Sequence, residues 1–565
     1  MAMPPRQRPE FLSIRRPPPA FLAMGVALIW VAPLRAQEAG GGLAAAAGPV
    51  GAAIGGGSLG DPADQRSASG GERVRLGPFG VGFAGADEAP EGPARAWNIS
   101  PAITVGVGAT NNVYQSSSDA RSDLFFGITP SIVVDGSSTR VRATLSYAPS
   151  ARLYATYTDQ NNVAQIGNAQ VLAELIPNTL FLDIRGSANL ATASGGIAPG
   201  TAQDVQRNNQ VQVYNFLASP YYVHRFGSFA TAQVGYVFQS YTQTGTQQFT
   251  PGATQPFFND QDYIANRGYA VVRSGEDFGR LALQARVDGT VFSGTGVYDG
   301  AHIFVSAIEA RYVILPTIAV VAEGGYENIE YSGTDPQKIN DALWSVGARW
   351  TPSPDSYLLI RYGHRGGFTS PSLEAGIQLG AYTRLTATYQ ESLGTSGTLA
   401  QDLLSATTLD SIGNPVDART GAPVIYANPF FSTTSGLFRT KYGSAAITFT
   451  WPRDNVTVYA SYQDQDPVSA AEGTQISQST GYYGGVTWTH EITPRTAVQT
   501  RLQVGRTEFA NSPATTAYFA SAALYHRFTE KLSGMVQILY TNQSSNQTGA
   551  GFGQAVALAG VSRTF

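Results

Sequence analysis

The sequence VRATLSYAPSARL, from Val141 to Leu153, alternates between two kinds of residue. One set of alternate positions is mostly apolar, whereas the other carries Arg142, Thr144 and Arg152. Because successive side chains of a strand point to opposite faces, this period of two predicts a strand with one apolar and one polar face. A run of this length is about twice the ~5–6 residues of an ordinary strand, and it is long enough to cross a bilayer at a tilt.

The same alternation recurs along the chain, at 180–187, 281–288, 456–463 and 532–541. Tight turns between such segments are predicted at 135–136, 177–178, 226–227, 316–317, 352–355, 452–455, 493–494 and 529–530. Longer polar connections lie between them, at 190–206, 244–261, 332–339, 394–440, 464–476 and 542–551. Alternating short turns and long loops are typical of transmembrane β-barrels. We therefore predict an all-β fold: a large antiparallel up-and-down transmembrane barrel of roughly 22 strands, within a range of 20–24.

Composition supports a barrel over other classes of protein. Charged residues make up 13% of the chain and hydrophobic residues 43%, with 62 Gly, 28 Tyr and 27 Phe. No apolar run after residue 36 is long enough for a transmembrane helix. The absence of cysteine excludes disulfides and thiolate metal sites, and a net charge of -4 argues against a nucleic-acid partner. We expect no cofactor.

The two ends of the chain indicate export. Residues 1–36 are predicted to be a signal peptide, with basic residues before an apolar stretch and cleavage between Ala36 and Gln37. Residues 37–95 are rich in Gly and Ala, and we expect a flexible periplasmic segment that cannot form a folded plug. The barrel is assigned to 96–565. Its terminal Phe565 resembles the signal read by the barrel-assembly machinery, although Arg563 departs from that pattern. These features predict the bacterial outer membrane, with its lipid and the assembly machinery as partners.

Charged residues that share the polar faces of the strands are the candidate site. Those predicted to face the lumen are Arg142, Arg152, Asp183, Arg185, Arg286, Asp288, Glu309, Arg311, Glu323, Glu327, Arg349, Arg361 and Glu374. One interpretation is a transverse field across a channel that selects polar solutes. The other is a ladder of salt bridges between consecutive strands, such as Arg286 and Asp288 beside Glu309 and Arg311, that holds the wall in register. Neither interpretation requires a catalyst.

The five histidines do not form a metal-binding motif. His364 lies near the outer end of its strand with no acid nearby in that strand, which favours a rim histidine. We predict that the protein is not an enzyme. Aromatic residues near strand ends are expected to form girdles at the headgroup layer, namely Trp344, Trp350, Tyr482, Tyr483, Trp488 and Tyr540. The alternative is an aromatic track for sugars inside the lumen, to which Tyr154, Phe181 and Tyr459 would contribute.

The connection 394–440 is the longest, and its part 399–412 has apolar residues at near-helical spacing. Connections of this length are usually functional or disordered. Two interpretations remain open at this stage: the connection folds into the barrel as a constriction, or it lies outside as a lid.

Two segments carry a resemblance to a known family. WNISPAITVGVGATNNVYQSSSDARSDLFFGITPSIVV (97–134) resembles the first two strands of the β-barrel porin 2 family, with Asn111, Asn112 and Tyr114 in the loop. FRTKYGSAAITFTWPRDNVTVYASY (438–462) is similar to barrels of exopolysaccharide gene clusters of the PEP-CTERM/exosortase type. The resemblance implies a barrel that handles or exports an envelope polysaccharide, with that polysaccharide and periplasmic export proteins as further partners.

Three functional hypotheses follow from these observations. The first is a porin-like channel for polar solutes or a polysaccharide chain, based on the polar lumen and the predicted lack of a plug. The second is a structural scaffold that binds periplasmic partners through 37–95, and deleting that segment separates it from the first. The third is an outer-membrane hydrolase, which the sparse histidines disfavour.

Overall fold

The computed structural model describes residues 74–76, 82–84, 97–193, 206–245, 248–249, 256–258, 260–398, 407–409, 415–417, 435–510, 512–545 and 551–565. Three predictions therefore stay untested and remain predictions. The signal peptide with its cleavage between Ala36 and Gln37 lies outside the described residues. Most of the predicted flexible segment 37–95 also lies outside the described residues. The same holds for most of 399–412, the part of the long connection with near-helical spacing.

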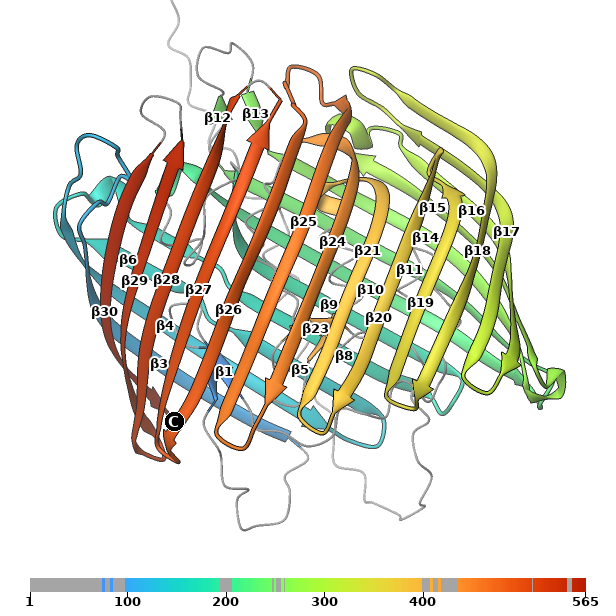
Figure 1. Ribbon diagram of the computed structural model, residues 1–565, viewed down its shortest axis with the longest axis horizontal. Helices are drawn as coiled ribbons and strands as arrows, with labels where there is room; N and C mark the ends of the chain where they lie inside the picture. Colours follow the sequence, from blue (N-terminus) through green and yellow to red (C-terminus); the bar gives the residue numbers. More distant parts are fainter. Residues whose placement is uncertain are drawn as a thin grey trace, which may run out of the picture. The chain divides into compact units, whose positions relative to one another are not determined.

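The described chain is built almost entirely of long antiparallel strands (Figure 1). Those of the barrel are β3 (Trp97–Thr110), β4 (Asp123–Ser137), β5 (Val141–Tyr147), β6 (Ser150–Tyr154), β7 (Asn162–Ala164), β8 (Gly167–Ile176), β9 (Leu180–Thr192), β10 (Gln210–Phe226), β11 (Ala230–Gly245), β14 (Gln261–Ser274), β15 (Leu281–Gly294), β16 (His302–Leu315), β17 (Ile318–Tyr331), β18 (Gln337–Ser353), β19 (Ser356–Arg365), β20 (Phe368–Gly380), β21 (Thr383–Thr395), β24 (Gly436–Thr450), β25 (Asp454–Ala470), β26 (Ser479–Thr493), β27 (Thr496–Phe509), β28 (Ser512–Thr529), β29 (Leu532–Ser545) and β30 (Phe552–Thr564).

Shorter elements complete the described chain. Three two-stranded pairs are formed by β1 (Val74–Leu76) with β2 (Gly82–Ala84), β12 (Gln248–Phe249) with β13 (Pro256–Phe258), and β22 (Thr407–Leu409) with β23 (Pro415–Asp417). The single-turn 3-10 helices are η4 (Thr158–Gln160), η6 (Arg207–Asn209), η7 (Glu276–Phe278) and η8 (Gly296–Tyr298). Over the described ranges, no helix is both long and apolar enough to span a membrane.

The barrel has 22 crossings within the described chain, which confirms the predicted fold class and strand number. Each strand pairs with its neighbours in the chain, and β3 pairs with β30 to close the sheet. An even number of antiparallel strands allows this closure and puts both ends of the barrel on the same rim. The connections on that rim are all short. The long connections lie on the opposite rim, which also carries the two-residue turn between β19 and β20.

Two of the crossings are broken into pairs of shorter strands, which corrects the prediction of one continuous strand from Val141 to Leu153. The first crossing consists of β5 and β6, and the ladder is interrupted at Ala148 and Pro149. Proline has no backbone N–H to donate, so it interrupts a ladder in the interior of a sheet. β7 and β8 form the second broken crossing and pair with β6 and β5 in turn.

The two faces of the wall differ in chemistry. Large apolar side chains are exposed on the outer face, including Val107, Phe126, Leu502, Val536 and Ile538. Alternate residues on the inner face are buried and often polar or charged. An apolar outer band with a polar interior is the pattern of a barrel embedded in lipid.

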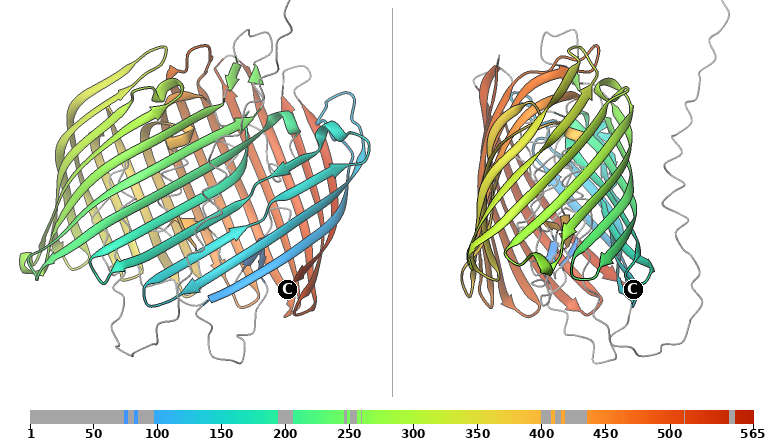
Figure 2. Two further views of the ribbon diagram at one scale, coloured as in Figure 1. Left: turned by 180° about the vertical axis from the view of Figure 1, so that it is seen from behind. Right: turned by 90° about the vertical axis from the view of Figure 1, so that its right-hand side faces the viewer.

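The barrel is flattened. Figure 1 looks onto its broad side, and the right-hand view of Figure 2 looks onto its narrow side. Flattening brings opposite walls close to each other, so that strands far apart around the barrel can touch across the lumen. The contacts between opposite walls at the long-loop rim, described below, are of this kind.

The seam between the first and last strands carries additional side-chain bonds. Asn112 Nδ2 donates to the backbone oxygen of Gly553 at 3.0 Å, and the Asn111 side-chain oxygen accepts from the N–H of Ala555 at 2.8 Å. Thr104 Oγ1 donates to Ser562 Oγ at 2.9 Å within the ladder. The Asn-Asn pair singled out in the sequence therefore lies at the seam of the barrel.

The wall parts at the long-loop rim between β20 and β21. Their ladder ends at the pair Leu373–Tyr389, so that 368–372 of β20 and 390–395 of β21 have no register with each other. Pro371, which cannot donate a backbone bond, lies in the parted section of β20. The following part of β21 pairs only with β24. It is therefore free to leave the wall.

Glycines inside the wall make room for inward-facing rings. A Cβ at Gly235 would lie 2.3 Å from the hydroxyl oxygen of Tyr269 and 2.5 to 2.6 Å from two of its ring carbons, and Tyr269 is only 5% exposed. Gly235→Val should therefore lower the free energy of unfolding by about 1–3 kcal/mol, because overpacking displaces a fixed ring. Urea unfolding of the refolded barrel in lipid vesicles measures this. Gly268→Val is the matched control, since nothing lies within 4 Å of a Cβ there, and equal losses in both variants would contradict the explanation.

Candidate functional site

The structure places most of the predicted lumen residues on the inner face of the wall. Ten of the thirteen candidates are less than 9% exposed: Arg152, Asp183, Arg185, Arg286, Asp288, Glu309, Glu323, Glu327, Arg349 and Arg361. Arg311 and Glu374 are half-buried, and Arg142 is exposed near the short-turn end of β5. Their role in solute passage remains a prediction.

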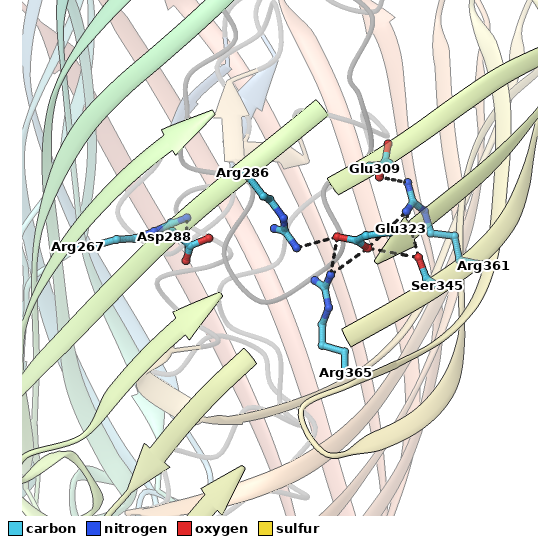
Figure 3. A network of polar contacts seen from close by, with 8 residues as sticks. All are labelled: Arg267, Arg286, Asp288, Glu309, Glu323, Ser345, Arg361 and Arg365. Carbon is cyan, nitrogen blue, oxygen red and sulfur yellow. Dashed lines mark hydrogen bonds and ion pairs between the residues drawn. The ribbon is translucent and has the colours of Figure 1, made fainter. Parts of the chain in front are cut away.

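A connected network of ion pairs lies on the inner face of β15–β19, and the separate pair of Arg267 with Asp288 lies beside it (Figure 3). Glu323 of β17 is at its centre. Arg286 Nη2 lies 2.9 Å from Glu323 Oε1, and Arg365 Nη2 lies 3.1 Å from both oxygens of that carboxylate. Arg361 lies 3.8 Å from Glu323 and 2.7 Å from Glu309. One buried carboxylate thus serves three guanidinium groups.

The partners in this network differ from the predicted ladder between consecutive strands. Arg286 on β15 reaches Glu323 on β17, and Arg361 on β19 reaches Glu309 on β16. Both pairs skip at least one strand. The inner face of a closed barrel is concave, so long side chains can meet across the curve instead of bonding to the adjacent strand. The pair of Arg267 with Asp288, at 3.6 Å, does join neighbouring strands, β14 and β15.

Residues that the sequence reasoning missed complete the network. Arg267 alternates with Tyr263 and Tyr269 on β14, so the period of two could have identified it. Arg365 lies four residues after Arg361 and therefore on the same face. Ser345 Oγ donates to Glu323 at 3.3 Å, a contact that no sequence pattern indicates.

A two-residue turn binds Glu327, an acid on the same strand as Glu323. Gly366 and Gly367 connect β19 to β20 with positive φ angles of 64° and 79°, which is the backbone of a tight hairpin turn that glycine favours. Their N–H groups both donate to Glu327 Oε1, at 2.5 and 3.3 Å. Glu327 is 1% exposed, so these two bonds compensate for its burial. The short β19–β20 hairpin is thereby tied to the inner face of β17.

Other charged candidates form separate local contacts. Arg185 and Asp183 pair within β9 at 2.9 Å, and both are buried. The Arg152 guanidinium lies 4.8 Å from the centre of the Phe125 ring, and that of Arg349 lies 5.0 Å from the centre of the Tyr357 ring. These contacts hold the wall together and suit the structural interpretation of the charges.

The inner face of β25–β30 has a different lining. Its buried polar side chains are mostly amides and hydroxyls, namely Gln463, Gln465, Tyr483, Gln503, Thr507, Gln537, Thr541 and Gln554. Such groups both donate and accept hydrogen bonds without a net charge. The lumen is therefore bordered by a charged wall on one side and, on the other, by a wall whose buried polar groups are mostly uncharged, with Asp464 as an exception.

An aromatic cluster closes part of the lumen at the long-loop rim. It consists of Tyr241, Tyr263, Phe292, Tyr298 and Tyr331, each no more than 5% exposed. Ring centres lie 4.3 Å apart for Tyr263 and Tyr298, and 5.3 Å apart for Tyr241 and Tyr263. The rings come from β11, β14, β15, η8 and β17, so they cover one side of the barrel interior.

The root of the long connection 394–440 packs on this cluster. Thr395 is fully buried and its hydroxyl bonds to that of Tyr298, while Tyr263 Oη donates to the Gly397 backbone oxygen at 3.3 Å. On the returning side, Leu437 is also fully buried in the cluster. β21 and β24 thus turn into the lumen above the point where the wall parts. The described root of the connection, 394–398 and 435–437, thus packs on the aromatic cluster inside the mouth of the barrel.

A second contact joins opposite walls at the same rim. The N–H of Thr334, after β17, donates to the Ala470 backbone oxygen at 2.9 Å, and Ser469 Oγ donates to the Ser332 backbone oxygen at 3.3 Å. Ser469 and Ala470 end β25, which lies far from β17 around the barrel. The rim is therefore bridged above β15–β17.

The predicted aromatic track does not form a single surface. Tyr154 packs with Phe125, Phe181 stacks on Tyr221, and Tyr459 contacts Tyr483, in three separate places. Tyr483 also corrects the predicted girdle: it is 8% exposed and faces inward, because adjacent residues of a strand cannot share a face. Trp344, Trp350, Tyr482, Trp488 and Tyr540 are exposed on the outer face, as expected of a girdle.

The histidines bond to residues of neighbouring strands. His364 Nε2 lies 2.9 Å from Asp341 Oδ2 and its Nδ1 lies 2.9 Å from Thr369 Oγ1, an acid and a hydroxyl that the sequence reasoning did not connect with it. His302 and His490 make comparable bonds to Asn328 and Asp454. The His364 arrangement thus belongs to a wider pattern of bonds between strands. Among the described residues, no group of three or more His, Asp or Glu side chains could hold a metal ion.

The predicted assembly residue lies at the end of the seam. Phe565 is 63% exposed, and its N–H donates to the Pro101 backbone oxygen at 3.0 Å. The Arg563 guanidinium lies 5.6 Å from the centre of the Phe565 ring. Recognition of Phe565 by the assembly machinery remains a prediction.

No known protein family and no curated protein matches the chain by sequence. Solved structures similar to it include two receptors and one transporter. The siderophore receptor PirA from Acinetobacter baumannii has 9% identity and a TM-score of 0.44, with 83% of this chain and 80% of that chain covered. The ferric-catecholate import receptor Fiu from E. coli K12 has 12% identity and a TM-score of 0.45, with 82% and 81% covered. The FrpB iron transporter from Neisseria meningitidis has 7% identity and a TM-score of 0.42, with 82% and 81% covered. We therefore base function on the residues of this barrel alone.

Proposed function

We propose that the protein is a non-enzymatic outer-membrane channel for polar, hydroxyl-rich solutes. The observation that supports this best is the lining of the lumen, with charged residues on one wall and amides and hydroxyls on the other. Buried side chains of this kind can exchange hydrogen bonds with a hydrated solute as it passes. The constriction at the long-loop rim makes the channel selective by size. The segment 37–95, whose composition predicts no folded plug, is consistent with a channel.

Handling of an envelope polysaccharide is the finer form of this proposal. It rests on the resemblance of 97–134 and 438–462 to barrels of exopolysaccharide gene clusters. The amides and hydroxyls of β25–β30 support it, since a saccharide chain presents hydroxyls that both donate and accept hydrogen bonds. Neighbouring genes for glycosyltransferases and an export lipoprotein would strengthen the finer form.

Planar lipid bilayers test the channel directly. Refolded protein lacking residues 1–36 should produce stepwise increases of ionic current, because each inserted barrel adds one water-filled path. Protein that is added unfolded provides the control. Bilayers that contain folded barrels and stay silent, including for the variant with an enlarged mouth described in the Discussion, would contradict the proposal.

A further inference from the structure

Two neighbouring crossings of the wall are interrupted at the same height. The first breaks at Ala148 and Pro149, and the second breaks at Gln165 and Ile166, between β7 and β8. A backbone bond from the N–H of Ala148 to the oxygen of Ile166, at 2.8 Å, joins the two breaks. The hairpin of β6 and β7, on the long-loop side of the breaks, is therefore connected to β5 and β8 by two short, irregular links.

The ladder is missing on the far side of this hairpin. β7 pairs with β6, whereas the pairing of β8 with β9 ends at Gly167 and Ala188. Beyond that point 189–191 of β9 pairs with β10, and no ladder joins it to β7, although both segments belong to the described chain. We call this interruption of the ladder, between 162–165 and 189–191, the β7–β9 gap.

Gln212 of β10 takes the place of the missing ladder. Its side chain accepts a bond from the N–H of Gln165 at 2.9 Å, and donates to the backbone oxygens of Gln165 at 2.9 Å and Asn189 at 3.0 Å. Asn162 of β7 also donates to the Gln210 side-chain oxygen at 2.8 Å. Side-chain amides release such bonds by rotating about their own torsions, whereas a ladder parts only when a strand moves. The β7–β9 gap is therefore closed by contacts that can open separately.

The gap lies in the apolar outer band of the barrel. Leu153 and Val163, on the two strands of the hairpin, are 47% and 61% exposed on the outer face. Gln212 alternates with Val211 and Val213, which are buried on the inner face, so its amide lies on the outer face as well. In the hydrocarbon of a bilayer, backbone polar groups must have hydrogen-bond partners. An open gap at this height therefore needs a ligand that replaces the bonds of Gln212.

We propose that the wall opens laterally at the β7–β9 gap and passes a lipid-linked saccharide between the lumen and the membrane. When Gln212 turns away, one backbone N–H and two backbone oxygens lose their partner. Sugar hydroxyls both donate and accept hydrogen bonds, so they can satisfy all three groups. The acyl chain of the same molecule lies along Leu153 and Val163 in the membrane. This inference rests on the proposed channel and names a class of solute that leaves it through the wall.

A photoreactive glycolipid tests the opening without any current being measured. Full-length protein is refolded into phosphatidylcholine vesicles that contain glucosyl diacylglycerol with a diazirine on its glucose, and mass spectrometry identifies the labelled residues. We expect label on 162–166 and 189–191, including Ala164 on the inner face of β7. Ala445 and Ala460, which pair in an intact ladder on the outer face, should carry at least about fivefold less label, because a sugar avoids hydrocarbon where the backbone is already bonded. Equal label at the gap and at this pair would overturn the proposal.

A linked variant separates an opening from a fixed defect that Gln212 merely fills. The chain has no cysteine, so Asn162→Cys combined with Gln210→Cys can be joined by a short bismaleimide after refolding, and folding does not enter the comparison. The linked protein should lose most of the label at the gap relative to the same variant capped with N-ethylmaleimide, because the hairpin can no longer move away from β10. Equal label in the linked and capped proteins would overturn the proposal.

Current measured on the same two proteins keeps this inference apart from the proposed channel. The linked and capped barrels should carry the same current, since the link lies in the wall. Label at the gap in a barrel that carries no current would contradict the channel and leave the lateral opening standing. Current without label at the gap would overturn the lateral opening and leave the channel standing.

Discussion

Replacing Glu323 by glutamine should lower the free energy of unfolding of the barrel by about 3 kcal/mol. Glu323 is 8% exposed and is the shared partner of Arg286, Arg361 and Arg365. Removing its charge leaves three guanidinium groups buried near each other, with Glu309 paired to Arg361 and Glu327 near Arg365 as the remaining acids. Breaking a buried ion pair from one side is costly because the remaining charge keeps its desolvation penalty. Urea unfolding in lipid vesicles, followed by tryptophan fluorescence, measures the loss.

Glu330→Gln is the matched control on the same strand. Glu330 pairs with Lys338 at 2.7 Å, but the lysine side chain is 70% exposed. Exposed ion pairs contribute little to stability, so this variant should unfold at the urea concentration of the unmodified protein. If the two variants unfold together, the network around Glu323 is not a stabilising unit, and the transverse-field interpretation gains weight.

Shortening the inward-turning part of β21 and β24 should raise single-channel conductance severalfold. The variant replaces 391–440 by a two-residue turn, so that the hairpin ends near Gln390 and Lys441, just beyond the last pair of β20 with β21, Leu373 with Tyr389. This removes Leu393, Thr395 and Leu437 from the aromatic cluster. A pore that is narrowed by packed apolar groups conducts poorly, and removing them lets water and ions enter.

A variant shortened at 546–550, between β29 and β30, controls for the loss of a connection as such, and we expect its conductance to stay the same. Tyr298→Phe provides a milder test, because it removes the hydroxyl that bonds to Thr395 and keeps the ring. We expect it to increase the frequency of large current steps without changing their maximum size. Identical conductance in the shortened and unmodified barrels would show that the mouth does not limit the current.

The sequence was sufficient for the fold because barrel strands carry their own signal. Each crossing repeats the period of two, and turns such as Pro177-Asn178 are local; Asn178 adopts a positive φ of 57° there. Pro149 itself is visible in the sequence, but the break in the ladder is not, since β6 keeps its pairing with β4 after the interruption. Local patterns thus identify strands better than they identify where a ladder fails.

The candidate site was predictable only in part, for a geometric reason. Parity along a strand assigns a side chain to the inner face, which is how Arg286, Glu309 and Glu323 were found. The partner of a long side chain depends on the curvature of the wall, so the pair of Arg286 with Glu323 across β16 was not predictable. The constriction depends on contacts between residues more than a hundred positions apart, such as Tyr263 and Gly397, and no periodicity encodes them.

The seam between β3 and β30 has a kinetic consequence. Its bonds join residues more than 450 positions apart, as for Thr104 and Ser562, which are 458 positions apart. Bringing such distant segments together costs loop entropy before any bond is gained, so closure is expected to be the slow, late step of folding. Until then β3 and β30 are both open edges that can pair with other chains. The side chains of Asn111 and Asn112 bond to β30 and favour the correct register once the two edges meet. We expect these bonds to shorten the time for which the edges stay open.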